Sequence, residues 1–175
     1  MKRFHFPKTR FVELATRQGG VTRDMAVGGA LKNIESARAE SDEMMLKSIA
    51  AIEEIAYAPS ALKGLGAEDM RAVLRLADQI VTLAGMFCYD NLDTATRSLC
   101  DLVDGMLNSG VSDAPPVIVH AKALRLLAPG SPPVSDTEVQ KVLTGLEKVL
   151  SHYHFEPLSN AANVQSGDEA NFEVG

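Results

Sequence analysis

Between Leu92 and Leu107, apolar and polar residues recur with the period of an α-helix, about 3.6 residues per turn. One face of that helix would carry Leu92, Ala95, Thr96, Leu99, Val103 and Met106, with Leu102 and Leu107 at its edges. The opposite face would carry Asp93, Arg97, Asp101 and Asp104. Because such a helix buries its apolar side, we expect this stretch to be the core helix around which the other elements pack.

A long first helix is predicted from Thr22 or Asp24, both good N-terminal caps, to Tyr57, since Pro59 prevents continuation. Its apolar stripe consists of Val27, Leu31, Ile34, Met45, Ile49, Ile52 and Ala56. Arg38 and Ser41 interrupt this stripe on the same face. The interruption fits a kink, a helix that extends beyond the core, or two shorter helices broken near Ser41.

Three further helices follow from apolar periodicity and local stop signals. The second main helix is expected over 67–85 and the next from Ser112 or Asp113 to about Ala128, with Pro115 in its first turn. Ser135 and Glu138 have the spacing of a capping box, which predicts a last helix from there to about His154. Gly110 is a natural stop for the central helix.

The composition also favours helices. Aromatic residues make up 5% of the 175 residues and there is no Trp, so aliphatic side chains must form the core. We predict an all-α protein, an antiparallel bundle of four to five helices over 21–156. A basic, aromatic arm with Phe4, Phe6 and Phe11 occupies 1–20, and a disordered acidic tail is expected over 157–175.

Charge and cysteine content exclude several classes of protein. The net charge of −6 argues against general nucleic-acid binding, which needs a basic face. No apolar run approaches the roughly 20 residues that span a bilayer, and we expect a cytoplasmic protein. Cys88 and Cys100 are too few for a disulfide framework, and neither has a basic neighbour that would activate it.

His120 is the titratable residue of most interest. It lies in the middle of a predicted helix, two residues before Lys122. Histidine phosphotransfer domains carry a reactive imidazole on a helix of a four-helix bundle with a Lys close behind, so His120 is a candidate phosphoacceptor. The helical wheel instead directs His120 toward Val117, Leu124 and Leu127, which favours a hydrogen-bonded core histidine.

Asp93, Arg97, Asp101 and Asp104 form a polar row on the central helix. Paired carboxylates can act as acid and base or hold a metal, but Arg97 between them favours a solvated ladder of weak pairs. His152 and His154 lie about 200° apart on a helix, and no other ligand completes a metal site. We expect neither metal nor cofactor.

Two stretches resemble the CheE-type proteins, small helical proteins encoded in bacterial chemotaxis gene clusters. The first is 19–22 (GGVT) with 30–35 (ALKNIE); the second is 98–105 (SLCDLVDG) with Val119-His120 and 124–127 (LRLL). The resemblance covers about 19–150. It implies an accessory role in chemotaxis or two-component signalling rather than a known reaction.

We therefore expect a non-enzymatic cytoplasmic adaptor whose partner is a signalling protein such as a response regulator or a histidine kinase. The partner would meet Asp93, Arg97, Asp101, Asp104 and Arg125. A homodimer is also compatible with the sequence. Two alternatives stay open: a histidine phosphotransfer protein that uses His120, and a helical domain that senses a small ligand between its helices.

Overall fold

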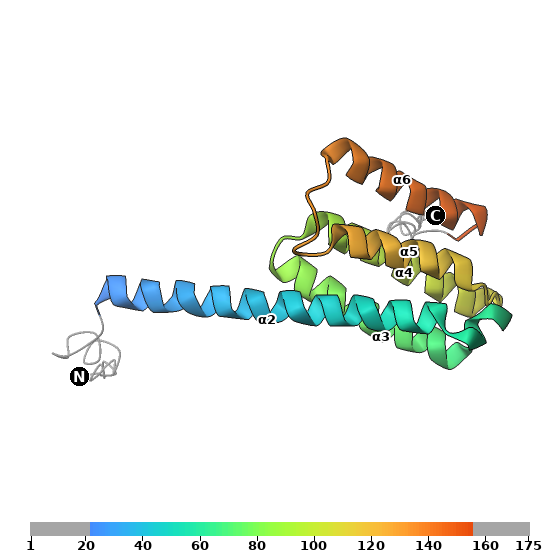
Figure 1. Cartoon of the computed structure of the whole chain (residues 1–175), viewed down its shortest axis with the longest axis horizontal. Helices are drawn as coiled ribbons and strands as arrows, with labels where there is room; N and C mark the ends of the chain where they lie inside the picture. Colours follow the sequence, from blue (N-terminus) through green and yellow to red (C-terminus); the bar gives the residue numbers. More distant parts are fainter. Residues whose placement is uncertain (1–21, 156–175) are drawn as a thin grey trace, which may run out of the picture. The chain divides into compact units, whose positions relative to one another are not determined.

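The computed structural model describes residues 22–155, which form five α-helices, one short 3₁₀ helix and no strand. The helices are α2 (Arg23–Tyr57), η1 (Pro59–Lys63), α3 (Ala67–Met86), α4 (Asp90–Ser109), α5 (Ala114–Leu127) and α6 (Asp136–His152). The predicted all-α bundle is confirmed (Figure 1). The predicted arm, 1–20, and the predicted tail, 157–175, lie outside the described residues.

The chain divides into two compact units between Ala39 and Glu40. Residues 22–39, the described part of the first unit, form only the beginning of α2, and nearly all of them are exposed. The first part of the predicted apolar stripe is exposed: Val27, Leu31 and Ile34 are all open to solvent, Leu31 by 62%, which agrees with the alternative of a helix that extends beyond the core. Periodicity indicates which face of a helix is apolar, but not that another element covers it. Buried residues of α2 begin only at Ser41, and the helix continues through that position without a break.

In the second unit, α4 is the central helix, as predicted. It packs against α3, α5 and α6 (Figure 1). Its buried residues are Leu92, Ala95, Thr96, Leu99, Leu102, Val103 and Met106. The only hydroxyl among them, that of Thr96, donates to the carbonyl of Leu92 at 2.6 Å, so its burial leaves no polar group unsatisfied.

The ends of the helices follow the local signals in the sequence. Gly110 ends α4 with φ at 75°, a left-handed conformation that glycine adopts without strain. Ser135 caps α6: its Oγ accepts from the Glu138 amide at 3.3 Å, and the Glu138 carboxylate accepts from the Ser135 amide at 3.1 Å. The predicted capping box is therefore confirmed.

Polar side chains join the second part of α2 to its neighbours in this unit. Ser48 donates its hydroxyl to Gln79 Oε1 on α3 at 3.1 Å. Tyr89, immediately before α4, donates to Asp42 Oδ1 at 2.9 Å. These contacts connect residues 31 and 47 positions apart, so they fix the tertiary arrangement rather than the local helix.

Candidate functional site

His120 belongs to α5 and is fully buried on the side of that helix that faces α4. Its Nδ1 lies 2.8 Å from the carbonyl oxygen of Pro116, one helical turn earlier. A carbonyl can only accept, so Nδ1 carries the proton and the neutral ring accepts at Nε2. Ser98 Oγ of α4 lies 3.0 Å from Nε2 and donates to it. Burial lowers the pKa of His120, and the hydrogen bond to Pro116 opposes that shift in part.

This geometry makes His120 a structural link between two helices. Both ring nitrogens are occupied, and neither reaches solvent in this conformation. A phosphoacceptor must be open to an aspartyl phosphate, so the burial weighs against the phosphotransfer alternative. Ser98 and His120 resemble part of a hydrolase triad, but a backbone carbonyl stands where a carboxylate would orient the ring. Ser98 is half-buried.

The polar row on α4 separates into two parts. Asp93 and Arg97 form the expected ladder pair, with Oδ2 and Nε 2.8 Å apart. The hydrogen bond to Asp93 raises the pKa of Arg97. Since the Arg97 side chain is largely exposed, this pair contributes little to stability. Asp101 and Asp104 belong to a different environment, nearer the end of α6.

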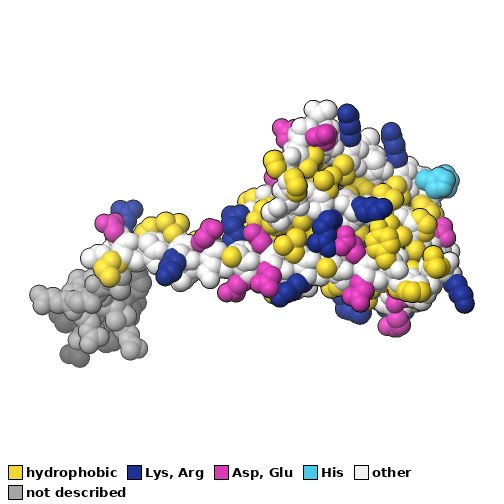
Figure 2. Space-filling view, in the orientation of Figure 1, with side chains coloured by type: hydrophobic (Ala, Val, Ile, Leu, Met, Phe, Trp, Pro, Cys, Tyr) yellow, Lys and Arg dark blue, Asp and Glu magenta, His cyan; other side chains and the backbone are white. Residues whose placement is uncertain are grey.

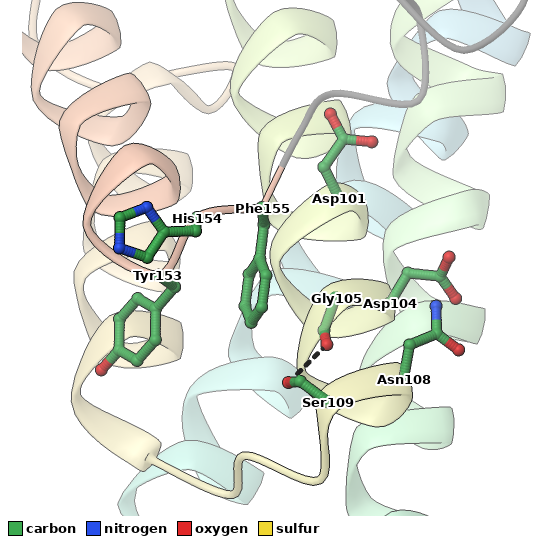
Figure 3. Close-up of a pocket in the computed structure, with 8 residues that line it drawn as sticks. All are labelled: Asp101, Asp104, Gly105, Asn108, Ser109, Tyr153, His154 and Phe155. Atoms are coloured by element: carbon green, nitrogen blue, oxygen red, sulfur yellow. Dashed lines mark hydrogen bonds between the residues drawn. The ribbon is translucent and has the colours of Figure 1, made fainter.

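Asp101 and Asp104 line a surface cavity of about 470 Å³. The other lining residues are Gly105, Asn108, Ser109, Tyr153, His154 and Phe155. Figure 3 shows the Phe155 ring standing beside Gly105, while the carboxylates extend from α4. A Cβ at position 105 would lie 2.5 Å from Phe155 Cγ, so the close approach requires glycine. The cavity is acidic along α4 and aromatic along the end of α6.

The aromatic wall forms because the chain turns back after α6. His154 adopts φ 58°, and the Phe155 amide donates to the Leu150 carbonyl at 3.2 Å. Tyr153 and Phe155 stack with centroids 5.7 Å apart. The Tyr153 hydroxyl donates to Asp113 Oδ2 at 3.1 Å. The pKa of Tyr153 is raised, mainly by burial and to a smaller extent by this hydrogen bond. The wall was not predicted from the sequence, although the aromatic residues just after the last apolar stripe were a signal.

Arg125 lies elsewhere, on α5. Its guanidinium forms a bidentate ion pair with Glu53 of α2, in which Nε lies 3.3 Å from Oε1 and Nη2 contacts Oε2. The hydrogen bond to Glu53 raises the pKa of Arg125. The structure therefore does not gather the five expected interaction residues on one surface: Asp101 and Asp104 share a cavity, whereas Arg125 connects α5 to α2.

A second surface feature, which was not predicted from the sequence, is a groove between α5 and α6. One part, about 350 Å³, is lined by Val119, Lys122, Ala123, Leu126, Lys141, Val142, Gly145 and Leu146. An adjoining part, about 300 Å³, is lined by Pro115, Pro116, Val119, Lys148, Val149, His152 and Tyr153. Val119 belongs to both parts. We call these lining residues together the α5/α6 groove.

The α5/α6 groove is apolar in its floor and basic at its edges. Val119, in the middle of α5, is 45% exposed and Leu126, near its end, is 39% exposed, high values for aliphatic side chains. Figure 2 shows hydrophobic side chains exposed over the part of the domain where Figure 1 places α5 and α6, with basic side chains beside them. Lys122, Lys141 and Lys148 line the groove, and no Asp or Glu among residues 22–155 does so.

The two cysteines lie in contrasting environments. Cys88 is exposed, at φ 59° in the turn before α4. Cys100 is half-buried on α4, and burial, assisted by Asp78 and Asp101, raises the pKa of its thiol to about 12. The Cys100 thiol therefore stays protonated at neutral pH and is a poor nucleophile.

Comparison with known proteins finds no matching family model, no matching curated protein and no matching solved structure. The resemblance to CheE-type proteins stays an expectation from the sequence. Among residues 22–155, no helix is long and apolar enough to cross a membrane. Within the same range, no three His, Cys, Asp or Glu side chains come together in a way that could hold a metal ion.

Proposed function

We propose that this chain is a non-enzymatic adaptor of bacterial chemotaxis or two-component signalling, which binds another signalling protein through the α5/α6 groove. The observation that carries the proposal is the groove itself, an apolar channel that the described residues leave open between two helices. Grooves of this kind bind amphipathic helices of partner proteins. The two CheE-like stretches support the signalling context.

The state of the reactive side chains favours binding over catalysis. Both ring nitrogens of His120 are hydrogen-bonded in the core, and the Cys100 thiol is held in its protonated form. Neither residue lines the groove or the acidic cavity. Neither His120 nor the Cys100 thiol is therefore placed to act as a nucleophile in the cavity or the groove.

Gly145 offers a direct test because it lines the groove, and a Cβ added there would meet nothing within 4 Å. Gly145→Trp fills the groove without a clash at Cβ. The matched control is Gly85→Trp: Gly85 is also exposed on a helix, α3, and also has open space at its Cβ. Circular dichroism and thermal melts establish that both variants fold.

Binding is measured by biolayer interferometry against a panel of purified response-regulator receiver domains and histidine-kinase dimerisation domains. We expect the wild-type chain to bind at least one of them, Gly145→Trp to weaken that binding by about tenfold or more, and Gly85→Trp to bind like the wild type. Equal binding by both variants would refute the groove as the binding surface.

A second experiment separates the adaptor from the phosphotransfer alternative. The chain is incubated with a response regulator carrying a labelled aspartyl phosphate, and the label on the chain is followed with time. We expect none to appear. Label that appears on the wild type and disappears with His120→Gln would overturn the adaptor proposal, because His120 would then have to open to solvent during the transfer.

A further inference from the structure

We infer that the occupant of the α5/α6 groove is an amphipathic helix of a partner protein whose flanks are rich in Asp and Glu. This inference rests on the proposed function and adds the chemistry of the partner. It follows from two properties of the groove, its length and the distribution of its charges.

The length of the groove fits a short helix. Its lining runs along α5 from Pro115 to Leu126, which at 1.5 Å per residue is about 16 Å, or three turns of a helix lying alongside. Val119 and Leu126 are exposed at its middle and at one end, and Val142 and Val149 lie half-buried on the facing wall. Such a floor accepts apolar side chains at positions i, i+4 and i+7 of a docked helix.

The lysines that line the groove favour acidic residues on the flanks of the docked helix. Lys122 stands on the α5 wall, and Lys141 and Lys148 stand two turns apart on α6. All three are exposed, and none forms an ion pair with a described residue. The groove is thus positive in a chain whose net charge is −6. Complementary charges at an interface rim mainly set specificity and the rate of association, while the apolar floor supplies affinity.

The experiment uses designed helices of about 18 residues, long enough to form under mild conditions. Three fluorescein-labelled peptides share one Leu-rich face and differ only in their flanks, which are Glu-rich, Gln-rich or Lys-rich. Binding to the full chain is followed by fluorescence anisotropy. We expect the Glu-rich peptide to bind about tenfold more tightly than the Gln-rich one at low salt, and the Lys-rich peptide to bind least.

Salt and charge reversal test the cause of that preference. Raising the salt from about 50 mM to about 500 mM should reduce the preference to about threefold or less, since exposed charges are screened. Lys141→Glu with Lys148→Glu should reverse the order of the peptides. The control, Lys32→Glu with Lys63→Glu, makes the same change of net charge at exposed positions outside the groove and should leave the order unchanged.

The outcomes distinguish the inference from the proposed function. If the Gln-rich peptide binds as tightly as the Glu-rich one and Gly145→Trp abolishes both, the groove binds helices without selecting acidic flanks, so the inference fails and the adaptor survives. Binding of none of the peptides also refutes the inference, and the receiver-domain panel then tests the adaptor separately. If a peptide of residues 160–175 displaces the Glu-rich helix at equal concentration, the occupant is the chain's own acidic segment and the inference is wrong.

Discussion

Helices α4 and α6 have similar sequence patterns but different surroundings. Each has an apolar stripe on one side and charged residues on the other. On α4 seven residues of the stripe are buried, because α3, α5 and α6 all pack against it. On α6 only Val139, Leu146 and Leu150 are buried, while Val142 and Val149 stay half-buried and line the α5/α6 groove.

This difference separates two uses of an amphipathic helix. The α4 stripe is covered completely by the chain itself, so its side chains contribute to the stability of the bundle. The α6 stripe is covered only in part, and the uncovered part is bordered by lysines. An apolar strip that the chain leaves open is available for another protein. Substitutions that affect stability and binding separately can test this division.

Leu99→Ala should have the largest effect. Leu99 is fully buried on α4, and its truncation leaves a cavity that the surrounding helices cannot fill, so we expect a loss of about 2 to 5 kcal/mol in the free energy of unfolding. Val142→Ala on α6 should cost about 1 kcal/mol or less, since its side chain is already half in water. Urea titrations measure both, and equal losses would contradict the contrast between the helices.

His120→Gln tests the polar link between α4 and α5. We expect it to cost about 1 to 3 kcal/mol at neutral pH, because Ser98 and the Pro116 carbonyl lose well-placed partners in the core. Thermal unfolding followed by circular dichroism at pH 7 measures this loss. A variant as stable as the wild type would show that the link is dispensable.

The stability of the wild-type chain and that of His120→Gln should respond differently to acid. The pKa of His120 is lowered in the fold, so the unfolded chain takes up the proton first as the pH falls below about 6.5. The contribution of the neutral imidazole is therefore complete above that pH and decreases below it, by up to about 1.4 kcal/mol per pH unit. His120→Gln should lack this extra acid sensitivity; parallel stability curves between pH 7 and pH 5 would contradict a buried neutral histidine.

Ser135→Ala should have a smaller effect, confined to α6. It removes the side-chain acceptor of the capping box, which we expect to cost about 1 kcal/mol and to increase amide hydrogen exchange in the first turns of α6. Exchange in α4 should not change. Faster exchange throughout the bundle would show that α6 is as integral to the core as α4.

Gly145→Ala should have the smallest effect and the opposite sign. Gly145 lies within α6 and a Cβ there has open space, so alanine should stabilise the helix by about 0.5 to 1 kcal/mol. One methyl group is too small to fill the groove, and peptide binding should be nearly unchanged. A variant that gains stability but loses binding would show that the groove closes on its ligand more tightly at this point.

Much of the fold could be predicted from the sequence because the signals are local. Ser135 with Glu138 starts α6, Gly110 ends α4, and the helical period of the apolar residues around Leu99 identifies the central helix. Each depends on neighbours within one or two turns. The exposure of Val27, Leu31 and Ile34 was only one of the alternatives that the interrupted stripe left open, because it depends on whether a distant segment covers them.

The candidate site was harder to predict for the same reason. The burial of His120 was indicated by its helical wheel, but its partner Ser98 is 22 residues away and becomes a neighbour only through the packing of α4 on α5. The cavity at Asp101 and Asp104 depends on the turn that brings Phe155 onto Gly105. The groove had a faint signal in Lys141, Gly145 and Lys148, which place lysines on either side of a glycine along one helix.

The contrast between Cys88 and Cys100 has a practical consequence for these measurements. An exposed thiol at the turn before α4 and a thiol kept protonated in the bundle should react with a maleimide at very different rates. The unaltered chain thus provides a single preferred attachment point for a dye or a spin label. Because Cys88 lines neither the groove nor the acidic cavity, a reporter placed there can follow docking without obstructing either surface.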